Sequence, residues 1–265
     1  MKEKGLMAAL IGEVFGTFIL ILLGDGVVTN VVLAPRLASG LAFDWNTIVF
    51  GWAFAVIVAV YVSAGASGAH LNPAVTIALA VKRGFAWAKV LPYIIAQMIG
   101  AFLGAAAVYL VYSDGLVSAG LPNVWCTGPG SIFGQAFWGG AAVAPALGSY
   151  SMLTASIAEF FGTAVLMWGV LASGDSRNTG LMHNMGPFLV GGTVLAVGLS
   201  LGGPSGYAIN PARDFGPRVF GTIIGTQGLF SDAYFLVPLI IPLIGGVAGA
   251  FAYDWFVTRG LPEKA

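Results

Sequence analysis

The chain has 265 residues, of which 58% are hydrophobic and only 8% are charged. Ordinary soluble domains carry about 25% charged residues, so this composition excludes a water-facing globular surface and indicates an integral protein of the lipid bilayer. Eleven Lys and Arg balance eleven Asp and Glu. With no basic excess to bind phosphates, nucleic-acid partners lack electrostatic support. The single cysteine, Cys126, excludes an intrachain disulfide framework and a thiolate-rich metal site.

Six apolar segments can cross a bilayer as helices. A membrane-spanning helix needs roughly 20 apolar residues to cover about 30 Å of hydrocarbon. The segments are residues 6–32, 48–64, 90–112, 152–172, 188–201 and 235–257. We expect the fifth helix to be longer than its apolar centre. The first segment is too long for a cleaved signal peptide and contains Glu13.

The basic residues indicate how the chain is oriented. Six spans place both termini on one side, and the Lys and Arg residues that then share that side are Lys2, Lys4, Lys82, Arg83, Lys89, Arg177, Arg259 and Lys264. The opposite loops, residues 34–46, 113–151 and 222–233, offer little more than Arg36. This asymmetry predicts cytoplasmic termini and a multi-pass protein of the cell membrane.

Motifs of the first half recur in the second. The sequence EVFGT at Glu13 recurs as EFFGT at Glu159, GAHLNPA at Gly68 recurs as GYAINPA at Gly206, and GAFLG at residue 100 recurs as GGVAG at residue 245. Each half, about residues 1–113 and 152–265, therefore contains two spans, an Asn-Pro-Ala element and a third span. Because three spans is an odd number, the second half is predicted to be inverted relative to the first.

Each Asn-Pro-Ala element is predicted to start a half-helix. Asn is a favoured N-cap and Pro a favoured first helical residue, so helices are expected from Pro73 to about Lys82 and from Pro211 towards Gly221. About ten residues span roughly 15 Å, which is half a membrane. The stretches before the caps, residues 67–71 and 204–209, read as non-helical. Unpaired backbone at that depth is tolerated only beside a wet cavity, which predicts a pore within one membrane domain of residues 1–265.

These paired motifs make the chain resemble the major intrinsic protein family, the aquaporins and glycerol facilitators, over essentially its whole length. The resemblance implies six transmembrane helices and two re-entrant half-helices in an all-α inverted repeat, no cofactor, and a homotetramer with one pore per subunit. It implies a passive channel for glycerol and similar small neutral solutes that also conducts water. Positive helix N-termini meeting at the centre repel cations and protons. The motif residues are Asn72, Pro73, Ala74, Asn210, Pro211 and Ala212.

The pore wall is expected to hydrogen-bond a passing solute from both motifs. The side-chain amides of Asn72 and Asn210 would donate to its oxygens while their carbonyls cap the half-helices. A ladder of backbone carbonyls would accept its protons and offset the cost of desolvation. These carbonyls belong to Gly68, Ala69, His70, Leu71, Gly206, Tyr207, Ala208 and Ile209.

The resemblance assigns the narrowest ring to Trp52, Gly198, Tyr207 and Arg213. Water-selective members usually carry His where this chain has Gly198 and a smaller residue at the position of Tyr207. We therefore expect Gly198 to open room, the two aromatic rings to face a carbon chain, and Arg213 to donate to hydroxyls. A water-selective channel is the alternative. Five further positions match glycerol-type members and are expected to support the ring: Tyr112, Asp214, Arg218, Pro238 and Leu239.

Three acidic residues inside the apolar segments have competing interpretations. Glu13 and Glu159 occupy equivalent repeat positions, which favours acceptance of hydrogen bonds from the non-helical backbone over proton coupling. Asp25 is expected either at the outer vestibule or at a solvated loop edge. A proton-coupled transporter would need one of these three carboxylates on a moving path. An intramembrane enzyme is disfavoured, because the sequence has no nucleophile elbow and no His cluster for a metal.

Overall fold

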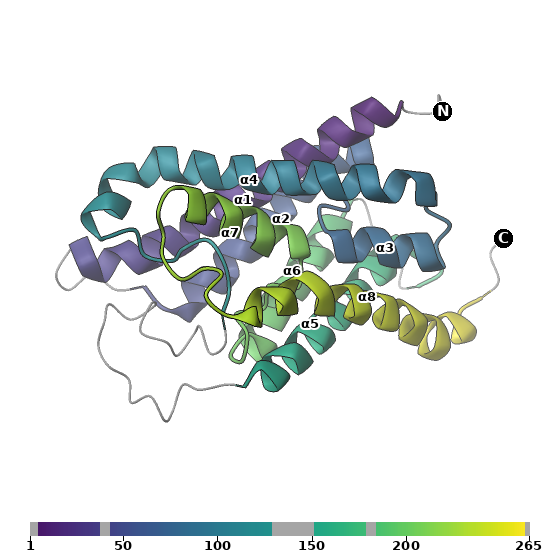
Figure 1. The fold of residues 1–265 in the computed structure, drawn as a ribbon. Coiled ribbons are helices and arrows are strands. Elements are labelled where there is room, and N and C mark those ends of the chain that lie inside the picture. The colour runs from purple at the N-terminus through teal and green to yellow at the C-terminus, as the bar shows by residue number, and fades with distance from the viewer. Residues whose placement is uncertain (1–4, 38–42, 129–150, 179–183, 263–265) are drawn as a thin grey trace.

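The computed structural model describes residues 5–37, 43–128, 151–178 and 184–262, and within these ranges it contains helices and no strand (Figure 1). The helices are α1 (Leu6–Leu37), α2 (Trp45–Ser67), α3 (Pro73–Lys82), α4 (Trp87–Ser118), α5 (Met152–Gly174), α6 (Gly186–Leu201), α7 (Pro211–Ile223) and α8 (Leu236–Phe256), with 3-10 turns at Ala233–Phe235 and Thr258–Gly260. Each of the six predicted apolar segments forms a helix. The all-α prediction is confirmed.

In the described part of the chain, five helices are long and apolar enough to cross a membrane: α1, α2, α4, α5 and α8. Helix α6 is also apolar but has 16 residues, about 24 Å at the usual rise, and begins at Gly186, just before its apolar centre. Helix α4 runs to Ser118, so the predicted outer loop 113–151 begins with helix. Residues 129–150 of that loop lie outside the described part.

The half-helices α3 and α7 lie end to end along the bundle (Figure 1). Helix α3 begins at Pro73 and ends at Lys82, as predicted. Helix α7 has 13 residues and continues past Gly221 to Ile223, so it is longer than the expected ten. Gly221 is closely packed inside this helix, because a Cβ there would lie 2.4 Å from Cδ1 of Trp125. This glycine therefore admits an indole against the helix instead of ending it.

The two halves pack in the same way and exchange their half-helices. Helix α1 packs on α2 and α4, and α5 packs in the equivalent way on α6 and α8. Helix α3 packs on α8 of the second half, whereas α7 packs on α4 of the first. The half-helices are thus held by the opposite half, which positions both of their N-termini inside the bundle.

Glycines at equivalent positions let the long helices approach. A Cβ at Gly100 would lie 2.3 Å from the carbonyl oxygen of Val14, and one at Gly245 would lie 2.4 Å from that of Phe160. Any larger residue would push α4 from α1 or α8 from α5. Such small-residue contacts are typical of helix packing in membranes, where close approach rather than water exclusion drives association.

One charged cluster fixes the far end of α3. Lys82 Nζ lies 2.9 Å from Oδ2 of Asp254, and Arg83 Nη2 lies 2.7 Å from Oδ1 of the same carboxylate on α8. The start of α1 and the end of α8 lie at this same end of the bundle (Figure 1). The cluster is partly exposed, so its effect is mainly to orient α3.

Candidate functional site

The segments before the half-helices adopt matching left-handed backbone conformations. The φ angle is +90° at Gly68, +50° at Ala69 and +50° at Leu71 in the first segment, and +86° at Gly206, +43° at Tyr207 and +43° at Ile209 in the second. Left-handed conformations cost non-glycine residues roughly 1–2 kcal/mol each, so four such residues need support from their surroundings.

Glu13 supports the first segment from helix α1. Its Oε1 accepts the backbone N–H of His70 at 3.0 Å, and its Oε2 accepts that of Leu71 at 2.7 Å. The side-chain amide of Gln97 donates to Oε2 at 2.7 Å. Glu13 is fully buried, and its two oxygens pair backbone donors that the helix ladder does not reach.

Glu159 supports the second segment in the same way from helix α5. Its Oε1 accepts the N–H of Ala208 at 2.8 Å, and its Oε2 accepts that of Ile209 at 2.7 Å. The hydroxyl of Ser205 also donates to Oε1 at 2.7 Å. The hydrogen bonds expected of the paired glutamates are therefore present in both halves.

Asn72 and Asn210 join the half-helices where their N-termini meet. Asn72 Oδ1 accepts the N–H of Ala74, and Asn210 Oδ1 accepts the N–H of Ala212 and of Arg213. Both asparagines therefore cap their helices, as predicted from the Asn-Pro pairs. Pro73 and Pro211 occupy the first helical positions.

The amide nitrogens of these asparagines donate across the join. Asn72 Nδ2 lies 2.8 Å from the carbonyl oxygen of Ile209, and Asn210 Nδ2 lies 2.8 Å from that of Leu71. These two carbonyls belong to the predicted acceptor ladder, and each already accepts one hydrogen bond from the opposite half. An amide carries two N–H groups, so each asparagine keeps one donor for a ligand.

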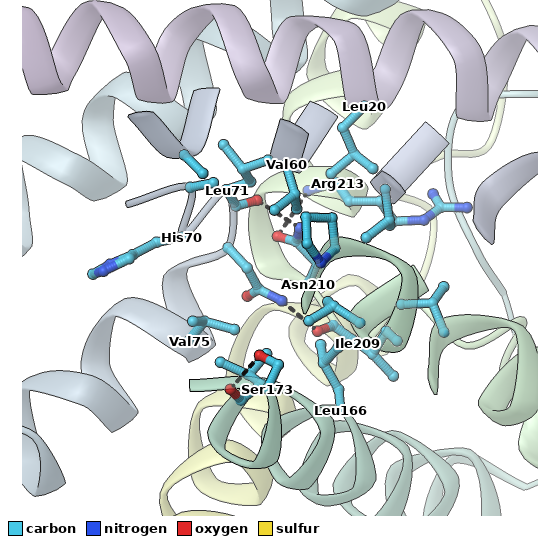
Figure 2. Close-up of a pocket in the computed structure, with 18 of the residues that line it drawn as sticks. Leu20, Val60, His70, Leu71, Val75, Leu166, Ser173, Ile209, Asn210 and Arg213 are labelled. Atoms are coloured by element: carbon cyan, nitrogen blue, oxygen red, sulfur yellow. Dashed lines mark hydrogen bonds between the residues drawn. The ribbon is translucent and has the colours of Figure 1, made fainter. Parts of the chain in front are cut away.

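A cavity of about 270 Å³ passes both motifs and is lined by polar groups and by aliphatic side chains. Its polar wall includes His70, Asn72, Asn210 and Arg213, and the side chains of its apolar wall include Leu20, Val56, Val60, Leu79, Leu166, Val170, Val190 and Val194. Figure 2 shows Asn210 between His70 and Arg213, with Leu20 and Leu166 nearby. His70 Nδ1 lies 3.2 Å from the hydroxyl of Thr76, so this histidine is a bonded wall residue.

A second, smaller cavity of about 20 Å³ adjoins the first, and both are lined by Trp52, Tyr207 and Arg213. The second cavity also reaches Asn123 and Cys126. Three residues of the predicted ring therefore line both spaces, and we refer to the boundary that they share as the constriction. All three are buried.

Arg213 is held from several directions at this constriction. Its guanidinium carbon lies 4.1 Å from the centroid of the Trp52 ring, which is a cation–π distance. Its Nη1 lies 3.5 Å from the carbonyl oxygen of Trp125 and 4.0 Å from Oδ1 of Asp25. The indole N–H of Trp52 and the hydroxyl of Tyr207 are buried and have no hydrogen-bond partner among the described residues.

Gly198 acts differently from what we predicted. A Cβ there would lie 2.8 Å from Cζ of Tyr207 and 2.7 Å from Cγ1 of Val49. The space beside this glycine is therefore filled by the ring of Tyr207 and the side chain of Val49. Trp45 completes the packing, because its indole N–H donates to the carbonyl of Gly198 at 3.0 Å and its ring meets Tyr207 edge to face at 5.5 Å.

Asp214 and Arg218 form an ion pair behind the constriction. Arg218 Nη2 lies 2.7 Å from Oδ1 of Asp214, and Asp214 Oδ2 accepts both the N–H and the hydroxyl of Thr127. This pair anchors the segment that carries Trp125. Tyr112, Pro238 and Leu239 line neither cavity, although Pro238 is buried within α8.

Asp25 lies at neither of its two expected positions. It is inside helix α1 and has no exposed surface, so it is not a solvated loop-edge carboxylate, and it lines neither cavity. Its neighbour is Arg213. The apolar segment gave no information on which face of the helix would meet the constriction.

Several contributing residues were not predicted. Trp125 and Gln97 contact site residues from distant segments, and no local pattern marks them. Ser67 and Ser205 could have been found by extending the repeat one residue upstream, since their hydroxyls accept the N–H of Ala69 at 2.9 Å and of Tyr207 at 3.1 Å. The described residues contain no group of three His, Cys, Asp or Glu side chains suited to a metal.

Comparisons with known proteins agree with this architecture. The chain is 44% identical to a probable glycerol uptake facilitator protein of Thermotoga maritima, covering 94% of this chain and 99% of the relative. It is 43% identical to aquaglyceroporin-3 of Trypanosoma brucei brucei, covering 93% and 77%. The X-ray structure of the aquaglyceroporin from Plasmodium falciparum matches with a TM-score of 0.83 and 32% identity, over 96% of this chain and 98% of that one. The family model described as major intrinsic protein matches residues 1–253, and the chain belongs to that family.

Proposed function

We propose that this protein is a passive transmembrane channel for glycerol and other small neutral solutes, that it also conducts water, and that it excludes ions and protons. The family consists of channels and not of enzymes, and relatives named glycerol uptake facilitators and aquaglyceroporins support this solute class. The observation that carries the proposal is the constriction of Trp52, Tyr207 and Arg213 between two cavities.

The constriction suits an amphipathic linear solute. The aromatic side chains of Trp52 and Tyr207 offer apolar contact to a carbon chain, and the guanidinium of Arg213 donates to hydroxyl oxygens. Beyond it, the remaining amide protons of Asn72 and Asn210 and the carbonyls of the non-helical segments replace lost hydration. Many of the other side chains that line the cavity are aliphatic, so the carbon chain keeps apolar contact along the path.

The paired half-helices supply the barrier to cations. Each helix N-terminus carries roughly half a positive charge, and α3 and α7 present theirs at the same place. A hydrated proton or sodium ion meets two positive ends and loses water without gaining a counter-charge. A neutral solute has no such cost.

Two alternatives fit the geometry less well. Proton coupling would require a carboxylate that changes partners, but Glu13 and Glu159 each pair two backbone N–H groups of a fixed segment. A water-selective filter would favour a narrower and more polar ring than one bordered by two aromatic side chains.

Membrane placement follows from the helices and their surface. Large apolar side chains are exposed along them, including Leu110, Val111, Leu153 and Phe256, which favours contact with lipid. We further propose a homotetramer in the cell membrane with cytoplasmic termini. In this arrangement the repeat halves, about residues 1–113 and 152–265, are joined by a long extracellular loop.

Stopped-flow light scattering of proteoliposomes tests the function. Vesicles containing the protein should equilibrate glycerol faster than empty vesicles, without saturation and independently of a proton gradient. A panel of polyols and urea defines the size limit, and water flux is measured in the same vesicles. Flux driven by a proton gradient would indicate a coupled carrier, and water flux without glycerol flux would indicate a water-selective channel.

A further inference from the structure

A fully buried carboxylate lies beside the constriction without an ordinary partner. Asp25 has no exposed surface, and its Oδ1 lies 4.0 Å from Nη1 of Arg213. Neither carboxylate oxygen accepts a hydrogen bond from the part of the chain that the structure describes. An unpaired ionised carboxylate is costly in an apolar interior. The guanidinium is therefore the group that makes this position tolerable.

Gly24, the residue before Asp25 on helix α1, helps to position the same guanidinium. A Cβ at Gly24 would lie 2.2 Å from Cζ3 of Trp52, so the bare backbone lies against the indole. That indole lies under Arg213 at 4.1 Å. Gly24 thus leaves room for the Trp52 ring that stacks on the Arg213 guanidinium, while Asp25 places a carboxylate close to the same guanidinium.

The other charged groups behind the constriction already neutralise one another. Arg218 donates to Asp214 Oδ1 from both Nε, at 2.9 Å, and Nη2, at 2.7 Å. Thr127 occupies the second oxygen of Asp214. Asp214 is therefore already neutralised by Arg218. Among the described residues, the carboxylate that lies within 4.0 Å of the Arg213 guanidinium is that of Asp25.

We propose that Asp25 is a charge-compensating residue of the constriction, which acts through Arg213 to make the site neutral towards a passing solute. This inference rests on the proposed function. A lone guanidinium in a narrow, poorly hydrated site attracts small anions, which would bind there and block the pore. A guanidinium and a carboxylate together act as a dipole, whose field falls off faster with distance. Arg213 keeps its N–H donors for hydroxyls but presents less net charge.

Asp25→Asn tests the proposal because it keeps the side-chain shape and removes the charge. Glycerol flux into proteoliposomes is measured with increasing nitrate, a small anion, against gluconate at equal ionic strength as a large anion that does not enter. We expect nitrate to inhibit Asp25→Asn at a concentration about tenfold lower than the wild type. Equal inhibition of both proteins would overturn the proposal.

Replacing Arg213 shows whether Asp25 acts through the guanidinium. In Arg213→Gln with Asp25→Asn, the heightened sensitivity to nitrate should disappear. If it persists, Asp25 acts on the pore by another route and the proposal is wrong. This readout separates charge compensation from a structural role, because a packing defect alters glycerol flux equally in nitrate and gluconate.

The converse experiment changes Arg213 and leaves Asp25 intact. It therefore tests the proposal even if the Asp25→Asn variant fails to insert into the membrane. Arg213→Gln leaves the carboxylate uncompensated, and methylammonium should then inhibit glycerol flux at about tenfold lower concentration than in the wild type. Unchanged methylammonium inhibition would overturn the inference. Absence of glycerol flux in the wild type would instead refute the proposed function, which is a separate outcome.

Discussion

Asn72 and Asn210 each cap their own half-helix and donate to a carbonyl of the opposite segment at 2.8 Å. The oxygen of each side-chain amide accepts a hydrogen bond from its own half-helix, and the nitrogen donates to a backbone carbonyl of the other half. Asparagine is needed for this arrangement, because aspartate would keep the cap but lose the donor. The join is therefore both a structural link and the place where two helix dipoles meet a solute.

Replacing both asparagines by aspartate should weaken the exclusion of cations. Asn72→Asp with Asn210→Asp sets carboxylates at the two positive helix ends and opposes each to a carbonyl of the other half. We expect measurable sodium or proton conductance in vesicles where the wild type shows none. The conductance is read from a pH-sensitive dye and from sodium efflux.

The constriction could mask this gain, so the double variant is also combined with Arg213→Ala. A folded triple variant that still excludes sodium and protons would contradict the central barrier. Size-exclusion chromatography in detergent verifies that each protein is assembled before flux is compared.

Gly198→Ala should reduce glycerol flux more than water flux. The new Cβ would stand 2.8 Å from Cζ of Tyr207, so the ring must move towards the pathway and narrow it for a three-carbon solute. Adding Tyr207→Ala should restore glycerol flux, since it removes the ring that was displaced. The two fluxes are measured in the same vesicles. Equal losses of water and glycerol, without rescue, would point to a general packing defect.

Glu13→Gln and Glu159→Gln should each destabilise the protein by about 2 kcal/mol, because one buried backbone N–H in each segment loses its acceptor. The repeat predicts similar losses for the two variants. Thermal unfolding in detergent measures the effect, and Asp114→Asn, an exposed change on α4, is the matched control. Unchanged melting temperatures for the glutamate variants would mean that these bonds do not hold the segments.

Arg213→Ala should admit larger solutes through a wider constriction, because it removes the fixed guanidinium that stacks on Trp52. We expect polyols longer than glycerol to gain at least about tenfold in relative flux, by analogy with selection through pocket size. A polyol series in light scattering gives the cutoff. If the cutoff of a correctly assembled variant stays where it was, Arg213 does not limit solute size.

Much of the fold could be predicted because local chemistry fixes it. Asn before Pro determines where α3 and α7 begin, and the apolar segments determine the long helices. The end of α4 was missed because Ser113 and Asp114 interrupt the apolar run without breaking the helix. The length of α7 was missed because Gly221 looked like a helix end, whereas in the structure this glycine packs against the indole of Trp125 within the helix.

The site could be predicted where the same residue type recurs at equivalent positions of the two halves. Glu13 and Glu159 could be assigned one task because they recur with the motifs that they support. Asp25 has no counterpart of that kind, and whether it faces lipid, water or Arg213 depends on the rotation of α1. The role of Gly198 also depends on tertiary packing, since the ring that fills its space comes from a different element.

The exchange of half-helices between the halves has a consequence for biogenesis. Helix α3 is made early but packs on α8, and its last turn is held by Asp254 near the end of that helix. Until α8 has entered the bilayer, the first re-entrant segment lacks the wall that shields its backbone from lipid. We expect the nascent chain to hold this segment out of its final position until the last helix arrives. A chain that stops before α8 should then be a target for membrane quality control, and not a half-open pore.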